Sequence, residues 1–263
     1  MTQLDLLRKD ISDSLKRWEF WFYLGWNDIA KQYRRSFVGP IWITLNSALF
    51  IVAFGLVGAQ LFKHPLEEYL PYFCTGQIIF VFFSNLLNEG CNVYTGAAAF
   101  LKQTPYPKMA FVFRVVWRSL ILLAHNFIVI LIVLLWSGHI VEVNWPMFLI
   151  ALIVTVVSGL FAVAIMGALA TRFRDIPLIV SSVMQIAFFV TPVMWRPDQL
   201  TERAQLLVIW NPLAAYLDIL RQPLLGGVAS GSSWLMVFGM LTMMSVGFVF
   251  LYQVVRRRIV YWL

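Results

Sequence analysis

The sequence predicts an all-α integral membrane protein with six transmembrane helices. Hydrophobic residues make up 60% of the 263 residues and charged residues only 13%, whereas soluble domains average about 45–50% and about 25%. The apolar residues also gather in six stretches, each long enough to cross a bilayer as a helix, which takes about 20 residues. This length suits one helical bundle without a separate soluble domain.

The predicted spans belong to one domain over residues 41–263, preceded by a segment over 1–40. The spans cover 41–62, 69–92, 115–136, 146–171, 176–195 and 234–255. Lys and Arg collect in the cytoplasmic loops of membrane proteins. Most of the twenty Lys and Arg residues fall in the N-terminal segment, the second and fourth connections and the C-terminal tail. Both termini are therefore expected in the cytoplasm, which requires an even number of spans.

The N-terminal segment is predicted to form an amphipathic helix in the cytoplasmic membrane interface. Apolar residues recur with helical spacing over 4–24, and charged residues occupy the other face. The aromatic residues between Trp18 and Trp26 are typical of interfacial anchors. This helix is interpreted either as an anchor alone or as a platform for a partner protein.

The region 199–228 is apolar but is interrupted by Pro212, Asp218, Arg221 and Pro223. A seventh span here would move the basic tail to the outer side, against the charge distribution. We interpret the region as one or two short helices that enter the outer leaflet and return, which is tolerated where the backbone is buried in protein or lines a cavity. The alternative is a pair of helices lying on the outer membrane surface.

The sequence lacks a catalytic or metal-binding constellation. No Gly-Lys dipeptide occurs, so a Walker A phosphate loop is excluded and ATP hydrolysis would need another subunit. His64, His125 and His139 lack metal-ligand spacing. Cys74 and Cys91 would lie about 25 Å apart on one helix, too far for a disulfide. The net charge of +7 is assigned to membrane topology and lipid headgroups rather than to nucleic acid.

Two ionisable residues fall inside predicted spans, where such groups often have functions. Glu89 lies near the cytoplasmic end of the second span, so a structural hydrogen bond or a water-facing position is as plausible as a proton-transfer role. His125, next to Asn126 in the third span, is compatible with a simple bridge between two helices.

Five segments together resemble the membrane subunits of ABC polysaccharide exporters, in the type-2 ABC exporter class. The first, 24–42 (LGWNDIAKQYRRSFVGPIW), is similar to the family's entry into its first span. The others are 172–177 (RFRDIP), 191–195 (TPVMW), 210–213 (WNPL) and 221–226 (RQPLLG). They follow in the family's order over nearly the whole chain. The variant resembled most is the O-antigen type (Wzm-like).

The resemblance implies a homodimer that binds two copies of a separate nucleotide-binding subunit, which carries the ATP and Mg²⁺. It implies export of a lipid-linked polysaccharide across a bacterial inner membrane through a channel at the dimer interface. This chain itself would have no cofactor and no enzyme activity. Its direct partners would be the second copy, the ATPase, membrane lipids and the polysaccharide.

The resemblance also assigns roles to residues. Coupling to the ATPase would lie in the elbow Arg172, Phe173, Arg174, Asp175, Ile176 and Pro177. The outer gate would include Trp210, Asn211, Pro212 and Arg221. Spans one and five would line the channel, and their candidate aromatics are Phe50, Phe54, Phe188, Phe189 and Trp195. Aromatic faces suit sugar rings, although each ring alone is equally compatible with a lipid-facing position.

A lipid carrier would present a diphosphate at the cytoplasmic side, where guanidinium groups pair well with phosphate. The candidate contacts are Arg34, Arg35, Lys102 and Arg114, although the same residues also satisfy the topology rule.

Two rival functions remain at the level of sequence. A type-2 exporter of another cargo, such as a teichoic-type polymer, a lipid or a drug, would share the fold. A membrane-embedded transferase would need an essential acid or base at a membrane face, and the available carboxylates are not clustered.

Overall fold

The computed structural model describes residues 3–32, 34, 38–104, 106–199, 201–255 and 258–263. Every regular element in these ranges is a helix. The long helices are α3 (Ile41–Leu61), α4 (Leu66–Cys91), α6 (Met109–Ser137), α7 (Trp145–Arg172) and α11 (Gly231–Val255). The shorter ones are α1 (Gln3–Lys16), α2 (Trp18–Gln32), α5 (Ala98–Gln103), α8 (Ile176–Val190), α9 (Glu202–Ile209), α10 (Pro212–Leu224) and α12 (Ile259–Trp262), with 3₁₀ turns η1 (Thr95–Ala97), η2 (His139–Glu142) and η3 (Pro197–Gln199).

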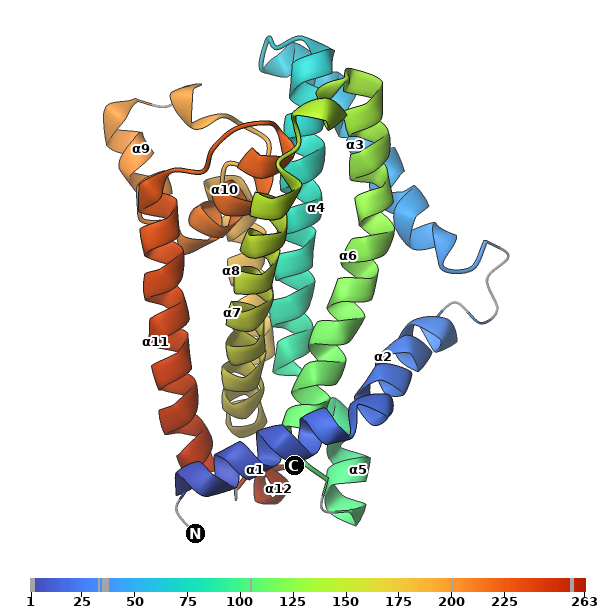
Figure 1. Ribbon diagram of the computed structural model, residues 1–263, viewed down its shortest axis with the longest axis vertical. Helices are drawn as coiled ribbons and strands as arrows, with labels where there is room; N and C mark the ends of the chain where they lie inside the picture. Colours follow the sequence, from blue (N-terminus) through green and yellow to red (C-terminus); the bar gives the residue numbers. More distant parts are fainter. Residues whose placement is uncertain (1–2, 33, 35–37, 105, 200, 256–257) are drawn as a thin grey trace.

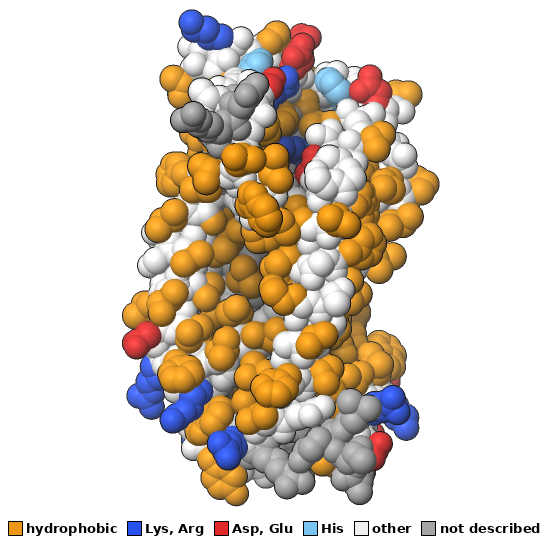
Figure 2. Space-filling model, turned by 90° about the vertical axis from the view of Figure 1, so that its left-hand side faces the viewer, with side chains coloured by type: hydrophobic (Ala, Val, Ile, Leu, Met, Phe, Trp, Pro, Cys, Tyr) orange, Lys and Arg blue, Asp and Glu red, His pale blue; other side chains and the backbone are white. Residues whose placement is uncertain are grey.

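The long helices run side by side along the longest axis of the molecule (Figure 1). Both termini, α1, α5 and α12 lie at the lower end in this view, and α9 and α10 lie towards the upper end. Hydrophobic side chains cover the middle of the face seen in Figure 2, and Lys and Arg gather near its lower end. These observations indicate a multi-pass membrane protein whose described ends share one side of the bundle.

Five helices, α3, α4, α6, α7 and α11, are long and apolar enough to cross a membrane. Their bounds agree with the predicted spans to within a few residues, except that α6 begins at Met109 rather than at residue 115. The fifth predicted span, 176–195, is too long at its C-terminal end, because α8 stops at Val190. With 15 residues α8 rises only about 22 Å, short of the hydrocarbon core of about 30 Å.

Pro192 explains the early end of α8. Proline lacks a backbone N–H and forces the preceding residue into an extended conformation, and Thr191 has ψ of 139°. The chain then continues without regular helix through residues 191–196, which we call the extended segment. The Tyr69 hydroxyl donates to the Met194 carbonyl at 2.9 Å, and the Tyr72 hydroxyl donates to the Trp195 carbonyl at 3.0 Å. Because Tyr69 and Tyr72 lie in the first turns of α4, the extended segment reaches the upper end of the bundle.

The N-terminal segment is two helices rather than the single amphipathic helix predicted over residues 4–24. α1 ends at Lys16 and α2 begins at Trp18, with a turn at Arg17. Figure 1 shows α1 lying across the lower end of the bundle and α2 continuing obliquely past α6. The break lets each helix follow a different part of the bundle surface.

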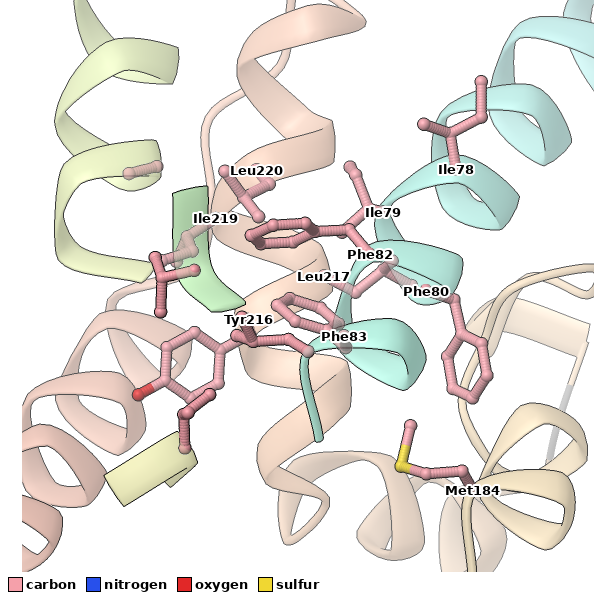
Figure 3. Close-up of a cluster of buried hydrophobic side chains, with 14 of the residues drawn as sticks. Ile78, Ile79, Phe80, Phe82, Phe83, Met184, Tyr216, Leu217, Ile219 and Leu220 are labelled. Atoms are coloured by element: carbon pink, nitrogen blue, oxygen red, sulfur yellow. The ribbon is translucent and has the colours of Figure 1, made fainter. Parts of the chain in front are cut away.

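α4 lies at the centre of the bundle and contacts helices on several sides. Figure 3 shows Phe82 and Phe83 of α4 close to Tyr216 and Leu217 of α10, and the rings of Phe83 and Tyr216 are 6.0 Å apart. Phe80 of α4 points instead towards α8 and Met184. α10 is therefore largely enclosed by protein, the setting in which short helices at membrane depth are tolerated.

Candidate functional site

A groove of about 580 Å³ lies between α4 and α8 and is bordered by α3. We call it the α4–α8 groove. Its lining residues are Phe50 from α3, Gln77, Phe80, Val81, Ser84 and Asn88 from α4, and Ser181, Met184, Gln185, Phe188 and Phe189 from α8.

The polar residues of the groove recur with helical spacing. Gln77, Ser84 and Asn88 are separated by seven and four residues, and Ser181 and Gln185 by four, so on each helix they share one face. Asn88 donates to the Ser84 carbonyl at 2.7 Å, whereas the buried Oε1 of Gln77 has no hydrogen-bond partner among the described residues. Uncharged polar side chains in membrane helices commonly hydrogen-bond to a neighbouring helix, and the Oε1 of Gln77, unpartnered in the described part of the chain, departs from that pattern.

The groove brings together three of the five predicted channel aromatics: Phe50, Phe188 and Phe189. Phe80, which the sequence argument did not select, packs edge-to-face against Phe188 with ring centroids 5.3 Å apart. Phe54 instead packs against Phe73, at 4.7 Å.

Trp195, the fifth predicted aromatic, lies beyond the groove in the extended segment. Its indole Nε1 donates back to the Phe189 carbonyl at 2.9 Å. Trp195 therefore contacts the backbone of α8 just above the groove.

At the lower end, the predicted coupling elbow forms a tight exposed turn between α7 and α8. Arg172, Phe173, Arg174 and Asp175 are exposed, and Ile176 and Pro177 begin α8. Proline is favoured in this first helical turn because its missing N–H would have no helical partner there.

The elbow also borders the C-terminal helix. The Arg172 guanidinium lies 5.5 Å from the ring centroid of Trp262. Arg174 and Pro177 share a small cavity with Trp262, Leu263 and the residues that follow α4. The elbow therefore combines an exposed charged surface with a contact to α12.

The interface helix α1 is fixed to the bundle by Asp10, which is 4% exposed. Its carboxylate accepts the backbone N–H groups of Lys108 and Met109, each at 3.2 Å, where α6 begins. The Tyr252 hydroxyl of α11 also donates to it. Burial and the nearby charge of Asp10 raise the pKa of Tyr94. One carboxylate thus joins α1 to two long helices.

Helix α2 is held by ion pairs near the same end. Arg114 of α6 donates to both carboxylate oxygens of Asp28, each at 2.7 Å. Arg118, one turn later, donates to Glu89 of α4 at 2.9 Å and to Gln32 of α2 at 3.3 Å. Of the alternatives considered for Glu89, the structure therefore shows the structural hydrogen bond. The two arginines together connect α6 to α2 and to α4.

His125 also makes a local contact. Its Nδ1 lies 2.8 Å from the Ile121 carbonyl in the same helix, and the Thr44 hydroxyl of α3 donates to the His125 carbonyl at 3.1 Å. The described contact between helices therefore runs through the backbone of His125 rather than its ring.

The predicted diphosphate contacts do not form one cluster. Arg114 is already paired with Asp28, Lys102 is exposed on α5, and Arg34 is exposed after the end of α2. Figure 1 shows that end of α2 leading away from α5. Arg35 lies outside the described residues.

The four predicted gate residues occupy different environments at the upper end. Trp210 is 75% exposed, whereas Arg221 is 3% exposed. Asn211 caps α10 by accepting the Leu213 N–H at 3.0 Å and donates to the Thr191 hydroxyl at 3.0 Å. Pro212 follows in the first turn of α10. Asn211 therefore connects α10 to the extended segment.

The family model described as "ABC-2 type transporter" matches residues 19–225 of this chain. The chain belongs to the ABC-2 type transporter family. The matched region of this ABC-2 transporter runs from α2 to the residue after α10 and includes the α4–α8 groove and the elbow. Members are transport permeases that work with an ABC ATPase, and this agrees with the prediction of a transporter rather than an enzyme.

Curated relatives of this ABC-2 transporter carry the name "O-antigen export system permease protein RfbA". One from Klebsiella pneumoniae is 22% identical over 191 residues, covering 72% of this chain and 74% of the relative. One from Myxococcus xanthus is 23% identical over 197 residues, with the same coverages of 72% and 74%. The predicted resemblance to O-antigen-type, type-2 ABC permeases is confirmed.

Sequence reasoning missed the polar half of the groove. Gln77, Ser84, Asn88, Ser181 and Gln185 were readable as polar residues on single helical faces within apolar stretches. It also missed Asp10 and Asp28, whose partners lie far away in the sequence. Their pairing depends on how the helices pack, which the local pattern does not encode.

Proposed function

We propose that this protein is the membrane subunit of an ATP-driven exporter that moves a lipid-linked polysaccharide of O-antigen type from the cytoplasm to the periplasm. It acts as a homodimer with two separate ABC ATPase subunits in a bacterial inner membrane, and both of its termini are cytoplasmic.

The α4–α8 groove is the observation that carries this proposal. Its lining combines the aromatic rings of Phe50, Phe80, Phe188 and Phe189 with uncharged polar side chains from α4 and α8. Rings can lie against the apolar faces of sugars while amides and hydroxyls exchange hydrogen bonds with sugar hydroxyls. None of its lining residues is charged, so it offers no strong ionic site at which a moving polymer would stall.

The exposed side of α8 supports closure of the groove by a second copy. Met184 is the single buried residue of this helix as described, and Val183, Ile186 and Phe189 are more than half exposed. A second α8 packed across this face would convert two half-grooves into one channel. A homodimer is expected because twofold symmetric pairs are the commonest oligomers.

The extended segment supports a sixth crossing. α8 rises from the elbow at the lower end, and residues 191–196 continue to the first turns of α4 at the upper end. α8 alone is too short to cross the hydrocarbon core, and the extended segment continues the chain over the remaining part of the crossing. Six crossings keep both termini on the basic side, which is cytoplasmic by the positive-inside rule.

A type-2 exporter of another cargo, such as a teichoic-type polymer, a lipid or a drug, remains the second candidate. The fold is equally suited to it. The polar stripes of the groove favour a polyhydroxylated polymer over an apolar drug.

Deletion of the gene in its native host tests the function. Lipid-linked glycan is extracted from the cells, surface glycan is measured separately, and a plasmid-borne copy serves as the control. We expect glycan to accumulate inside and to disappear from the surface, with both effects reversed by the plasmid. Normal surface glycan without internal accumulation would rule out polysaccharide as the cargo.

A further inference from the structure

A second cavity, of about 510 Å³, lies at the upper end of the molecule. We call it the upper cavity. It lies between the extended segment, η3, α9, α10 and the start of α11. Figure 2 shows a recess near the upper end of this face in which basic and acidic side chains are visible. Its volume is within the range of about 300–1,000 Å³ that is typical of small-molecule sites.

Arg221 forms the floor of the upper cavity. Its side chain comes from the last turn of α10 and is only 3% exposed. The Nη1 donates to the Pro192 carbonyl at 2.7 Å, and the guanidinium lies 3.9 Å from the ring centroid of Tyr72. The buried Nε finds no acceptor among the described residues. A buried charged group with an unused donor is costly unless a ligand or water completes it.

Arg196 adds a second guanidinium to the same cavity. It lies 5.2 Å from the ring centroid of Tyr72, and its buried Nε also lacks a partner among the described residues. Its nearest carboxylate, Glu68, is 3.9 Å away, which is too far for a hydrogen bond. Arg196, whose side chain is 27% exposed, and Arg221 both line the cavity, so two guanidinium groups border the same space.

Acceptors and hydroxyls complete the wall. Asp198 and Asp218 line the cavity, and neither is ion-paired with Arg196 or Arg221 among the described residues. Asp218 accepts the Ser230 N–H through Oδ2. Ser230, Ser232 and Ser233 add hydroxyl groups at the start of α11.

We infer that the upper cavity is a saccharide-binding site that holds one or a few sugar units of the glycan at the upper end. A guanidinium only donates hydrogen bonds and a carboxylate only accepts them, whereas a hydroxyl does both. A polyhydroxylated ligand can therefore satisfy both kinds of group at once. The two guanidinium groups and the two carboxylates balance in charge, so the cavity gives neither an inorganic anion nor a cation a net electrostatic advantage.

The identity of the ligand rests on the proposed export of a glycan, but its binding can be measured without transport. The probe is a set of oligosaccharides released by mild acid from the surface glycan of the native host. Binding to the full-length protein in lipid nanodiscs is followed by saturation-transfer NMR and titration calorimetry, with no ATPase subunit present.

The test variants are Asp198→Ala, which removes an exposed carboxylate, and Asp218→Asn, which keeps an acceptor for Ser230. The matched control is Glu67→Gln, an exposed carboxylate in the first turn of α4 that does not line the cavity. We expect each test variant to raise the Kd at least about tenfold, since hydrogen bonds to charged groups are strong, while the control keeps the wild-type Kd.

Absence of oligosaccharide binding to the wild-type protein would overturn the inference, and so would an equal Kd in all four proteins. Competition by millimolar sulfate would also overturn it, because it would identify an anion site. A deletion strain that still exports glycan would contradict the proposed function while leaving this binding result intact, so the two failures are distinguishable.

Discussion

At the scale of single residues, Asp10 bears most on how the interface helix is held. Replacing it with alanine removes the carboxylate that accepts the N–H groups of Lys108 and Met109 and the Tyr252 hydroxyl. We expect Asp10→Ala to lower the free energy of unfolding by about 1–3 kcal/mol and to make α1 more accessible to protease. Thermal unfolding in detergent and limited trypsin digestion measure these effects.

Asp13→Ala is the matched control, because Asp13 lies on the same helix and its described contact is a backbone one, in which its carbonyl accepts the Arg17 N–H at 3.2 Å. If both substitutions lowered the free energy of unfolding equally, the loss of a negative charge from α1, rather than the loss of the contact to α6, would explain the destabilisation.

The pair of Asp28 and Arg114 allows a charge-exchange experiment. Both side chains are about one-fifth exposed, so breaking the pair costs more than breaking a surface pair. We expect Asp28→Arg to destabilise the protein and loosen α2, and the double exchange Asp28→Arg with Arg114→Asp to restore much of the stability. A double variant as unstable as the single one would contradict a direct pairing.

The same double variant tests the predicted diphosphate contact of Arg114. If that guanidinium binds the lipid diphosphate, the restored protein still needs more substrate for half-maximal stimulation of the partner ATPase. If the substrate concentration for half-maximal stimulation stayed the same, Arg114 would have only a structural role. The sequence identified the charge of this residue, but its partner lies 86 positions away and follows only from packing.

At the scale of elements, the elbow between α7 and α8 offers exposed charges to a soluble partner. We expect Arg174→Glu, and separately Asp175→Arg, to uncouple ATP turnover from export while the protein still inserts in the membrane. The measurements are surface glycan, ATPase rate and membrane-embedded protein level. Normal export in both variants would remove the elbow from the coupling path.

Gly76 sets the distance between α4 and the extended segment. A Cβ at this position would lie 2.9 Å from the Val193 carbonyl oxygen, a backbone atom that cannot move aside alone. We expect Gly76→Val to displace the extended segment, lower the yield of folded protein and reduce export. Gly239→Val is the control, because a Cβ there meets nothing within 4 Å. Equal behaviour of the two variants would contradict a tight approach at Gly76.

The lengths of the apolar stretches predicted the long helices well, because a helix needs about 20 apolar residues to cross the bilayer. It failed at Val190, where Pro192 ends α8 although the sequence stays apolar up to Trp195. It also merged α1 and α2, because the apolar spacing continues through the turn at Arg17. Hydrophobicity locates segments in the membrane, but the ends of helices depend on local backbone chemistry.

At the scale of the whole molecule, the proposed dimer predicts which face meets the second copy. Val183 of α8 is 54% exposed and Val246 of α11 is 64% exposed. We expect Val183→Cys to form an intermolecular disulfide in membranes treated with a mild oxidant, and Val246→Cys to remain monomeric on non-reducing gels. The natural cysteines Cys74 and Cys91 are both buried, which favours a low background. Dimers through Val246→Cys alone would place the interface at α11 and contradict the proposed contact through α8.

The whole-molecule class was accessible from sequence because composition and five ordered motifs pointed to the same family. The groove was accessible only in part, since Phe50, Phe188 and Phe189 were selected but their polar neighbours were not. The upper cavity was anticipated only through Arg221, which was selected as a residue of the outer gate. Its wall combines α4, α10, the extended segment and the start of α11, and no local pattern relates these segments.

The anchoring of the extended segment has a mechanical consequence for α8. Hydrogen bonds from Tyr69, Tyr72 and Arg221 fix its upper continuation to α4 and α10, whereas its lower end is joined to α7 by a short exposed turn. A force applied at the elbow would therefore tilt α8 like a lever whose fulcrum lies at the upper end. Within the α4–α8 groove the displacement would be larger near Ser181 than near Phe188, so the groove would widen first at its lower end, which is the cytoplasmic end in the proposed function.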